Sequence, residues 1–580
     1  MEDNNMKTIK PSQARTASVL TLLVSALIIA GCGGGGSSGG DTSGTAPGVD
    51  APAAPQLSLD IQATKTFQFS WSAVEDATEY TLLENPDGQS GFTEVASIDA
   101  GETGYAHTVF LPRRVNASYM LEACNSGGCS ASTSVAVSGN LAEAVGYFKA
   151  SNTGATDVFG RSVALSADGS TLAVGADAEA SESTTINLGQ DNDDGLSNGA
   201  VYVFSREASG WAQQAYIKAS ATRSYAYFGI SVALSADGST LAVGTNNGNR
   251  AFVFTRDGTN WSEQALLEKP SAANNGFGRD LALSSDGDTL AVGVPRTGDP
   301  SNQGSSYGSG EVYVFARTGS DWDEQAVLEP FRYPQDEDQF GWAVALSGDG
   351  DHLAVGAPQQ DNDSAGVNGT SEGFATDSGA VYTFSRQADN WQAGDYIKAS
   401  NSGADDRFGY SVAMSADGRT LAVGALQEDG DADASVVSGA AYVFVRDTGW
   451  SEQSYLKAAN SDAYDRFGIS VSLSADGATL AVGASDERGN AIGINGAQDD
   501  NSAVSGAAYL FSRDSGVWAQ QAYIKPSNTD ANDSFGTAVA LSSDGATLAV
   551  GAIREDSNAT GVNGDQDDNS AERAGAVYLY

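Results

Sequence analysis

Apolar and polar positions recur along most of the chain in units that share one run of letters. The run FGRSVALSADGSTLAVGAD begins at Phe159, and close variants of it begin at six later phenylalanines, with neighbouring copies 49 to 69 residues apart. These six are Phe228, Phe277, Phe340, Phe408, Phe467 and Phe535. Each unit contains apolar runs of strand length bounded by turn sequences. Units rich in β-strand at this period predict a propeller rather than a helical solenoid.

Each unit is expected to form four strands. In the first unit the expected strands cover residues 162–166, 171–176, 200–206 and 214–220. The first two are almost wholly apolar, as expected where neighbouring sheets cover both faces of a strand. An Asp-Gly pair stands between them in every unit, and this pair indicates a tight hairpin because the turn needs a positive φ. We therefore interpret Asp168 and its six counterparts as turn residues.

The Phe-Gly pair that opens each unit has an expected structural role. The ring can fill the wedge between neighbouring sheets, and the glycine permits close backbone approach or a positive φ. Five units carry an aspartate two residues before the phenylalanine, and it is expected to cap the turn into the first strand. These aspartates are Asp157, Asp338, Asp406, Asp465 and Asp533.

The last unit ends without a fourth strand. It stops after GAVYLY at Tyr580, whereas a spare fourth-strand sequence, GYFKASN at 146–152, precedes the first Phe-Gly pair. We infer that this early strand completes the last sheet. Such pairing of the two chain ends closes a ring and removes exposed sheet edges, which otherwise promote aggregation.

The pattern FGxSVALSxDGxTLAVGA resembles the FG-GAP repeat, the unit of the integrin α-subunit propeller and of many bacterial surface proteins. The resemblance covers all seven units and implies an all-β fold with a seven-bladed β-propeller over residues 141–580. It also implies ligand binding on one face. Integrin propellers often hold calcium between strands one and two, but here that loop is shortened to SADG or a close variant. One carboxylate is too few for calcium, which needs six or more oxygen ligands, so we expect no calcium in these loops.

Residues 52–140 lack the repeat and predict a separate β-sandwich. The runs FQFSWSAV and TEYTLLEN alternate apolar and polar residues, as half-buried strands do. The segment resembles a fibronectin type III domain, with Trp71 as the early-strand tryptophan and Tyr80 in the next strand. The resemblance also implies a corner formed by Leu111, Pro112 and Tyr119, in which the tyrosine hydroxyl binds backbone. Such domains are commonly spacers or adhesive modules.

The first 32 residues resemble a bacterial lipoprotein signal. A basic start and the apolar run ASVLTLLVSALIIA precede IAGC, in which Cys32 would be lipidated. Ordinary signal cleavage, with Cys32 incidental, is the alternative. Residues 33–51 form an expected Gly/Ser/Pro linker, and glycine at position 33 favours the outer membrane. We expect an exported outer-membrane lipoprotein at the cell surface, whose lipid is its only membrane contact. In such a compartment Cys124 and Cys129 are expected to form a disulfide.

The formal net charge of −44 restricts the class of partner. Such a surface repels nucleic acid and anionic lipid headgroups, so neither is an expected partner. It attracts cations and basic partners. Solubility alone is the alternative explanation for the charge.

Several loops between strands two and three carry carboxylates at alternating or adjacent positions. Alternate side chains in a tight loop can converge on a hard cation, and calcium is the expected one outside the cell. A solvated acidic loop is the alternative. The candidate ligands are Asp429, Asp431, Asp433, Asp499, Asp500, Asp565, Asp567, Asp568, Asn569, Asp191 and Asp193. The second unit has only TNNGNR here and should leave a notch in the rim.

Catalytic chemistry is less supported by the sequence. The two histidines, His107 and His352, do not repeat and have no nucleophile nearby in sequence; His352 is expected to be an exposed hairpin residue. We therefore expect a binding or adhesion protein, not an enzyme, that uses the acidic loop face to hold a protein or glycan. A carbohydrate-active enzyme that uses loop carboxylates and a structural envelope scaffold remain the alternatives.

Overall fold

The computed structural model describes residues 49–221, 223–269, 275–296, 308–371, 373–430, 437–499 and 504–580. The expected signal segment, Cys32 and most of the linker lie outside these residues. Within the described ranges, no helix is both long and apolar enough to cross a membrane. The helical residues there are two short 3₁₀ turns, η1 (Leu111–Arg113) and η2 (Ala142–Ala144).

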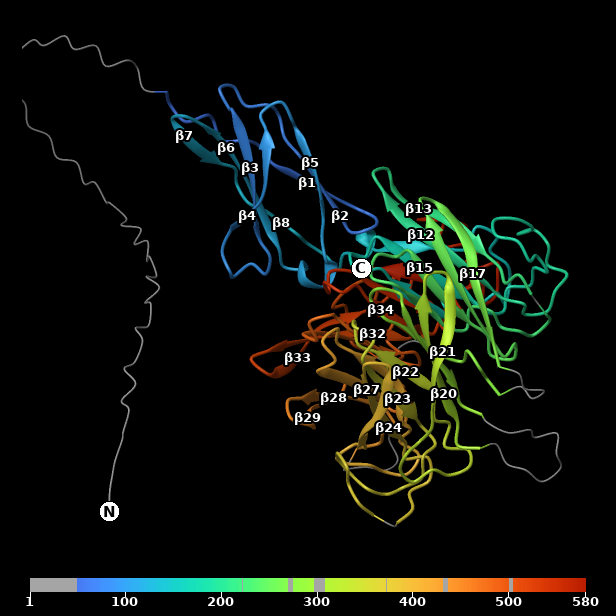
Figure 1. Cartoon of the computed structure of the whole chain (residues 1–580). Helices are drawn as coiled ribbons and strands as arrows, with labels where there is room; N and C mark the ends of the chain where they lie inside the picture. Colours follow the sequence, from blue (N-terminus) through green and yellow to red (C-terminus); the bar gives the residue numbers. More distant parts are fainter. Residues whose placement is uncertain are drawn as a thin grey trace, which may run out of the picture. The chain divides into compact units, whose positions relative to one another are not determined.

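The segment predicted to be a sandwich forms two sheets (Figure 1). The first contains β1 (Ser58–Gln62), β2 (Thr66–Ser70) and β5 (Gly104–Thr108). The second contains β4 (Thr93–Asp99), β3 (Glu79–Asn85), β6 (Ser118–Asn125) and β7 (Gly128–Ala131), and β8 (Val135–Ala136) also pairs with β6.

Aromatic side chains fill the core between these two sheets. Phe67, Phe69, Tyr80 and Tyr119 are fully buried, and the Trp71 ring lies 5.4 Å from that of Tyr80. One detail differs from the expectation. The Tyr119 hydroxyl donates to Glu84 Oε1 at 2.6 Å rather than to backbone, because the Glu84 carboxylate is buried beside it on the neighbouring strand β3.

Within the residues that the structure describes, the repeated part of the chain forms seven four-stranded antiparallel sheets. The first four, with their strands in order, are β10 (Ser162–Leu165), β11 (Thr171–Ala176), β12 (Ala200–Glu207) and β13 (Gly210–Ile217); β14 (Val232–Leu234), β15 (Thr240–Gly244), β16 (Arg250–Asp257) and β17 (Asn260–Glu268); β18 (Leu281–Leu283), β19 (Thr289–Val294), β20 (Glu311–Thr318) and β21 (Asp321–Leu328); and β22 (Ala343–Leu346), β23 (His352–Ala357), β24 (Ala380–Gln387) and β25 (Asn390–Ile397).

The remaining three sheets follow the same order. They are β26 (Phe408–Met414), β27 (Thr420–Ala425), β28 (Ala440–Arg446) and β29 (Trp450–Leu456); β30 (Phe467–Leu473), β31 (Thr479–Ala484), β32 (Ala507–Asp514) and β33 (Val517–Ile524); and β34 (Phe535–Leu541), β35 (Leu548–Ala552) and β36 (Ala576–Leu579) with β9 (Gly146–Phe148).

The fourth strand of the last sheet comes from the other end of the repeated region. β36 pairs with β9 in antiparallel register, with Val577 opposite Phe148, Tyr578 opposite Tyr147 and Leu579 opposite Gly146. The prediction that the early strand completes the last sheet is therefore confirmed.

The Asp-Gly hairpins follow the turn chemistry expected from the sequence. Asp168 Oδ1 accepts hydrogen bonds from Ser166 Oγ at 2.7 Å and from the Ser170 backbone N–H at 2.9 Å. Gly169 has a φ of +63°, in the left-handed region where glycine costs least. Because the carboxylate is already used inside its own turn, its interpretation as a turn residue is confirmed.

Neighbouring sheets touch through glycine. A Cβ added to Gly175, on the second strand of the first sheet, would lie 2.0 Å from the carbonyl oxygen of Gly229, in the next Phe-Gly pair. The equivalent contact recurs between every consecutive pair of sheets and passes from Gly551 back to Gly160 at 2.1 Å. Each phenylalanine of the seven pairs is at most 1% exposed, so the expected wedge role is confirmed.

Candidate ligand-binding site

Three consecutive residues from the first strand region of every sheet line one central cavity of about 290 Å³. The outermost of the three is the residue directly after each Phe-Gly pair, where the chain enters the first strand. This position is the one that changes most in an otherwise uniform motif. It holds Arg161, Ile230, Arg279, Trp342, Tyr410, Ile469 and Thr537. We call these seven residues the mouth ring.

The residues one step deeper hold the sheets together. Ser162 Oγ donates to the Gly229 carbonyl at 2.8 Å, and Ser411 Oγ donates to the Gly468 carbonyl at 2.9 Å. Asp280 bridges three sheets, since it accepts from Ser231 Oγ at 3.0 Å and from the Val344 N–H at 2.8 Å. The third layer consists of valines and one leucine. Polar groups below the mouth ring are thus engaged in structure.

Three mouth-ring side chains from consecutive sheets stack on one another. The Arg279 Cζ atom lies 4.2 Å from the centroid of the Trp342 ring, within cation–π distance. The Trp342 and Tyr410 rings lie 5.4 Å apart at 48°. All three side chains are half-buried, so stacking fixes their positions while part of each remains accessible to solvent.

The charges at the mouth are two arginines and two largely buried carboxylates. Arg161 Nε lies 3.7 Å from Asp177 Oδ2, which is a long ion pair. Burial first, and then the Arg161 charge, lower the pKa of Arg279. Burial raises the pKa of Asp177 and that of Asp280, although nearby arginine opposes both shifts. The mouth therefore lacks the large excess of negative charge that the chain has as a whole.

A side cavity of about 210 Å³ adjoins the mouth above the second sheet. Asn246 and Asn247 line it, together with the mouth-ring residues Arg161, Arg279 and Trp342. These asparagines belong to TNNGNR, the shortest loop between strands two and three. The notch predicted at this position is therefore present, and it widens the mouth on one side.

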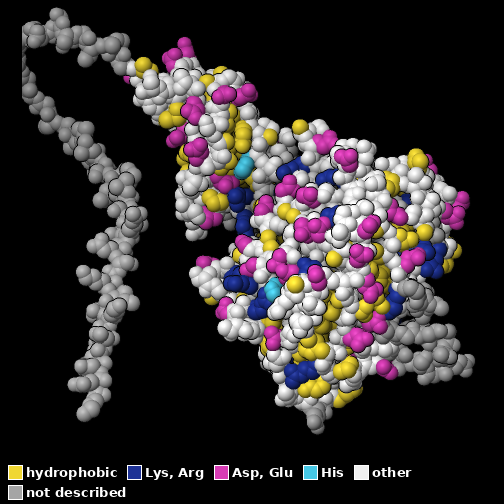
Figure 2. Space-filling view, in the orientation of Figure 1, with side chains coloured by type: hydrophobic (Ala, Val, Ile, Leu, Met, Phe, Trp, Pro, Cys, Tyr) yellow, Lys and Arg dark blue, Asp and Glu magenta, His cyan; other side chains and the backbone are white. Residues whose placement is uncertain are grey.

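The predicted calcium ligands lie in loops on the same face as the mouth. Asp191, Asp193, Asp565, Asp567, Asp568 and Asn569 are exposed, and Asp429 and Asp499 are half-buried. Asp431, Asp433 and Asp500 lie outside the described residues. Some of these side chains engage local groups: Asp565 Oδ1 accepts from the Asp567 N–H at 3.0 Å, and Asn569 Nδ2 donates to Asp530 Oδ2 at 2.9 Å. Figure 2 shows acidic side chains spread among uncharged ones on the face it presents.

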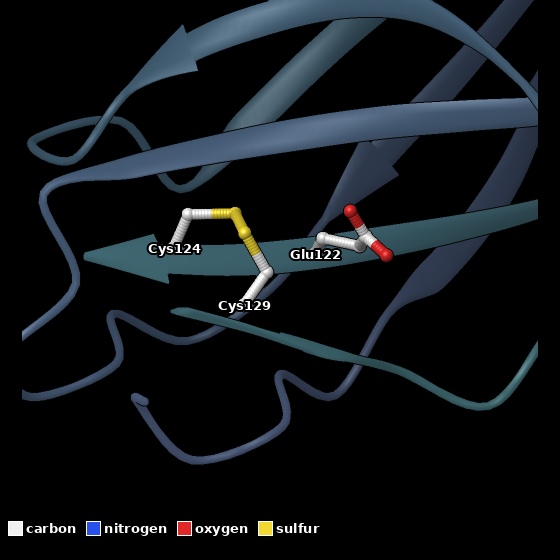
Figure 3. Close-up of side chains that lie close together, drawn as sticks. All are labelled: Glu122, Cys124 and Cys129. Atoms are coloured by element: carbon white, nitrogen blue, oxygen red, sulfur yellow. A yellow bond between two sulfur atoms is a disulfide. The ribbon is translucent and has the colours of Figure 1, made fainter. Parts of the chain in front are cut away.

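Among the described residues, one trio of side chains has its potential metal-ligating atoms within 4.8 Å of one another, namely Glu122, Cys124 and Cys129 (Figure 3). The two cysteines are joined in a disulfide across β6 and β7, as expected from the sequence. Sulfurs bonded to each other are not thiolate ligands, so this trio is no metal centre. The described loop acids form no such trio, and calcium binding by these loops stays a prediction.

The histidines occupy strands. His107 lies in β5, with Nε2 3.8 Å from Glu84 Oε1. His352 begins β23 and is half-buried, which corrects the expectation of an exposed hairpin residue. Arg446, from the next sheet, packs against it with Nη1 3.0 Å from His352 Nδ1. This burial, and then the Arg446 charge, lower the pKa of His352.

The sequence profile described as FG-GAP repeat matches six segments that together cover more than half of the chain: residues 145–204, 211–255, 322–384, 391–444, 450–511 and 518–580. The chain belongs to the FG-GAP repeat family. The matches leave out 256–321, which includes the third Phe-Gly pair, although the structure forms β18 to β20 from this part of the FG-GAP region. No curated protein sequence matches the chain.

Solved propeller structures resemble this FG-GAP protein only distantly. The β-propeller domain of Cps50 (Swd1) from Myceliophteria thermophila is 12% identical, with a TM-score of 0.43 and coverage of 72% of this chain and 96% of that one. The Dos1 propeller is 13% identical, with a TM-score of 0.37 and coverage of 75% and 93%. A putative 6-phosphogluconolactonase from Bacteroides uniformis is 10% identical, with a TM-score of 0.38 and coverage of 77% and 97%.

The FG-GAP units also contain a buried network that the sequence interpretation missed. Glu179 Oε2 accepts from Lys218 Nζ at 2.7 Å, and Glu179 Oε1 accepts from the Tyr216 hydroxyl at 2.8 Å. Lysine and glutamate are 0% and 1% exposed. Glu428, Glu487 and Glu555 hold equivalent pairs in three further sheets. The recurrence of glutamate three residues after the Gly-Ala of strand two could have revealed it.

The aspartates before the Phe-Gly pairs cap turns as expected. Asp157 Oδ2 accepts from the Gly154 N–H at 2.8 Å, and the other four accept from the backbone N–H three residues earlier in the same way. Burial first raises the pKa of Asp157 to about 7, and the charges of Glu179 and Asp193 add to the effect. A predicted calcium ligand of the loop thus lies close enough to the buried cap to affect its ionisation.

A second missed feature explains how the long loops are held. Asn187, from the loop after β11, accepts through Oδ1 from the Tyr216 N–H and donates its own N–H to the Tyr216 carbonyl, both at 2.8 Å. Asn368, Asn495 and Asn563 do the same for other fourth strands. Part of each loop therefore covers the outer edge of its sheet. An asparagine next to a glycine, or one residue from it, recurs in these loops and could have indicated this contact with the fourth strand.

Proposed function

We propose that this FG-GAP protein is a binding protein that holds a ligand at the mouth ring. The observation that carries this proposal is that the most variable position of the motif places five different residue types around a single cavity. The uniform positions of the motif are constrained by close contacts between sheets, whereas the residue at the mouth ring varies from sheet to sheet. The stacked Arg279, Trp342 and Tyr410 provide a broad, rigid surface of the kind that fixes a ligand.

The finer architecture belongs to the same proposal. The seven four-stranded sheets would be the blades of one closed propeller, and the two-sheet segment at 52–140 would be a fibronectin type III-like spacer. Lipidation at Cys32 and the linker at 33–51 would anchor the protein to the outer membrane. In this arrangement the protein is exported and presents its loop face for adhesion to a protein or glycan. The sequence at the IAGC site and the disulfide between Cys124 and Cys129 support export.

Calcium would assist rather than constitute the binding site. Acidic loops surround the mouth on the same face, and Asp193 and Asp429 each lie close enough to a buried cap aspartate to raise its pKa. A divalent cation would relieve this repulsion and order the loops. Calorimetric titration of the full chain with calcium should give heat and raise the melting temperature. Absence of both would leave solvated acidic loops as the explanation.

We propose binding without catalysis. The mouth ring offers stacking and cationic groups, while the carboxylate nearest the cavity, Asp280, is used by a serine hydroxyl and a backbone N–H. A general acid and base pair needs carboxylates that reach the substrate. These features favour a ligand that is held and released unchanged.

A glycan and protein array tests the proposed function. The full chain should bind at least one probe, and Trp342→Ala should weaken that binding ten-fold or more because Arg279 and Tyr410 lose their common support. Tyr464→Ala is the matched control, since Tyr464 is 58% exposed in a loop of the same face and lies outside the mouth ring. Equal binding by the wild type and Trp342→Ala, with both folded, would refute a site at the mouth.

A further inference from the structure

Positive charge at the mouth is unusual for this chain. The chain has 30 lysines and arginines against 74 aspartates and glutamates. Elsewhere in the described ranges, cationic side chains commonly have a close carboxylate partner: Lys218 lies 2.7 Å from Glu179, and Arg386 lies 2.8 Å from Asp351. At the mouth, two arginines from different sheets line the same cavity.

Arg279 differs from these paired cations. Among the described residues, no carboxylate oxygen lies within 4.0 Å of its guanidinium group, and its close contact is the Trp342 ring. Both oxygens of the adjacent Asp280 accept hydrogen bonds from Ser231 and Val344, so its negative charge, like that of Asp177, acts on Arg279 without a direct ion pair. A stacked guanidinium is held in one plane, and its N–H groups stay available in a fork that matches a carboxylate.

The second arginine reinforces the same preference. Arg161 has a carboxylate at 3.7 Å, longer than a good charge-assisted hydrogen bond, so it retains donors for another anion. Burial first, and then Arg161, lower the pKa of Arg279, which means that the two positive charges repel each other across the cavity. A bound anion would remove this repulsion, and the free energy so recovered would add to its affinity.

The other residues that line the two cavities indicate which class of molecule bears the anionic group. The main cavity of about 290 Å³ and the side cavity of about 210 Å³ share Arg161, Arg279 and Trp342, so the two form adjoining compartments. Asn246, Asn247 and a third arginine, Arg296, line the second compartment. The two amides can both donate to and accept from hydroxyl groups, and Arg296 adds another cationic group. Adjoining polar compartments suit consecutive sugar rings better than a single acidic side chain.

We propose that the mouth ring and the adjoining notch bind an acidic polysaccharide, with a uronate carboxylate on Arg279 and Arg161 and a neighbouring sugar over Asn246 and Asn247. This inference rests on the proposed function, because it names the ligand class of the same site. Binding would depend on the carboxylate and weaken as salt concentration rises, since added ions screen an exposed charge pair.

Titration calorimetry on the full chain provides the test. The probes are tetrasaccharides of galacturonate, glucuronate and mannuronate, each beside its carboxyl-reduced neutral counterpart. At least one uronate should bind ten-fold or more tightly than its counterpart. Arg279→Met should weaken that uronate ten-fold or more and leave binding of the neutral form unchanged, whereas Arg279→Lys, which keeps the charge but loses the planar fork, should lose less.

Arg488→Met is the matched control, because it removes the same charge from an exposed position in a loop on the same face, outside both cavities. It should bind the uronate as the wild type does, with all variants checked by their melting temperatures. Neutral sugars that bind as well as uronates, and need Trp342, would overturn the anionic preference and leave the proposed function standing. A glutamate-rich peptide that binds through Arg279 while no uronate does would also overturn it. Binding of no probe would overturn it as well, whereas the glycan and protein array with Trp342→Ala judges the proposed function separately.

Discussion

At the scale of single residues, the unusual groups are ionisable side chains buried at equivalent positions of the repeat. The lysine of strand four and the glutamate after strand two form a pair in four sheets, but the fourth sheet has Gln360 in place of the glutamate. There, burial lowers the pKa of Lys398 to about 7. The single replacement of a carboxylate by an amide thus leaves one lysine close to losing its proton at neutral pH.

Asp338, on the same sheet, makes the stability of the protein depend on pH. Burial, with the nearby Asp361 charge, raises its pKa from 3.8 to about 7. Below about pH 4 the group is protonated in both states. Between pH 4 and pH 7 the unfolded chain has released this proton while the folded chain keeps it, so the free energy of unfolding falls as pH rises. Above pH 7 the loss, on the order of a few kcal/mol, is complete.

Asp338→Asn should remove this loss, because asparagine stays neutral and can still accept from the Gln335 N–H, now 2.7 Å from Asp338 Oδ2. Calorimetry should find equal melting temperatures for the wild type and the variant near pH 4. The variant should melt increasingly higher as pH rises to about 7, and the difference should then stay constant. Asp447→Asn, at an exposed turn, is the control. A difference that does not change with pH would contradict the assignment.

At the scale of strands and turns, the glycine of the second strand sets the distance between sheets. Gly175 has an extended backbone, and its need for glycine comes from the Gly229 carbonyl 2.0 Å from an added Cβ and the Ser162 hydroxyl at 2.4 Å. These contacts lie far below ordinary van der Waals distance. The requirement is therefore one of space between neighbouring elements.

Gly175→Ala should lower the melting temperature markedly, with a cost of about 1–3 kcal/mol or more from overpacking between the first two sheets. Gly101→Ala is the control, since an added Cβ there meets no atom within 4 Å. Differential scanning calorimetry of the full chain compares the two. Near-equal melting temperatures for both variants would show that the sheets can move apart at little cost.

The sequence predicted the elements that depend on local chemistry. The Asp-Gly hairpins, the cap aspartates and the apolar strands were predictable because each depends on residues within a few positions. The contact of Gly175 with Gly229 and the mouth ring were not, because they join residues brought together only by the packing of sheets. The pair of Lys218 with Glu179 joins the ends of two strands of one sheet, and the recurring glutamate was its sign in the sequence. The variable residue after each Phe-Gly pair was visible in the sequence. Its position at the central cavity could be known only once the first strands of the sheets were placed.

At the scale of the whole molecule, the pairing of β9 with β36 joins residues more than 400 positions apart. The Tyr147 N–H bonds Asn563 and the Lys149 N–H bonds Gly561, both on the loop side. Since main-chain groups alternate in direction along a strand, the Phe148 N–H faces β36. The Phe148 ring also packs against Trp211 of the first sheet, with centroids 5.4 Å apart.

Phe148→Pro should open the last sheet, because proline has no N–H to donate to β36. Phe148→Ala is the matched variant, since it loses the ring but keeps the backbone. Both should melt lower than the wild type, and the proline variant should cost about 3 kcal/mol more. Light scattering should detect association of the proline variant alone, through the exposed edge of β36. Identical behaviour of both variants would mean that the last sheet does not need the hydrogen bond from the Phe148 N–H to β36.

The pairing of β9 with β36 also affects which part of the propeller unfolds first under tension. A pull transmitted along the chain from its N-terminal side first loads the hydrogen bonds that Lys65 and Asn140 make with Thr547 and Ile492. It then reaches β9, a strand of three residues that is held by one short ladder to β36 and by the loop at 558–563. The other six sheets are each built from a single continuous stretch of chain. When the chain is stretched from its N-terminal side, the ladder between β9 and β36 should therefore separate before the other propeller sheets open.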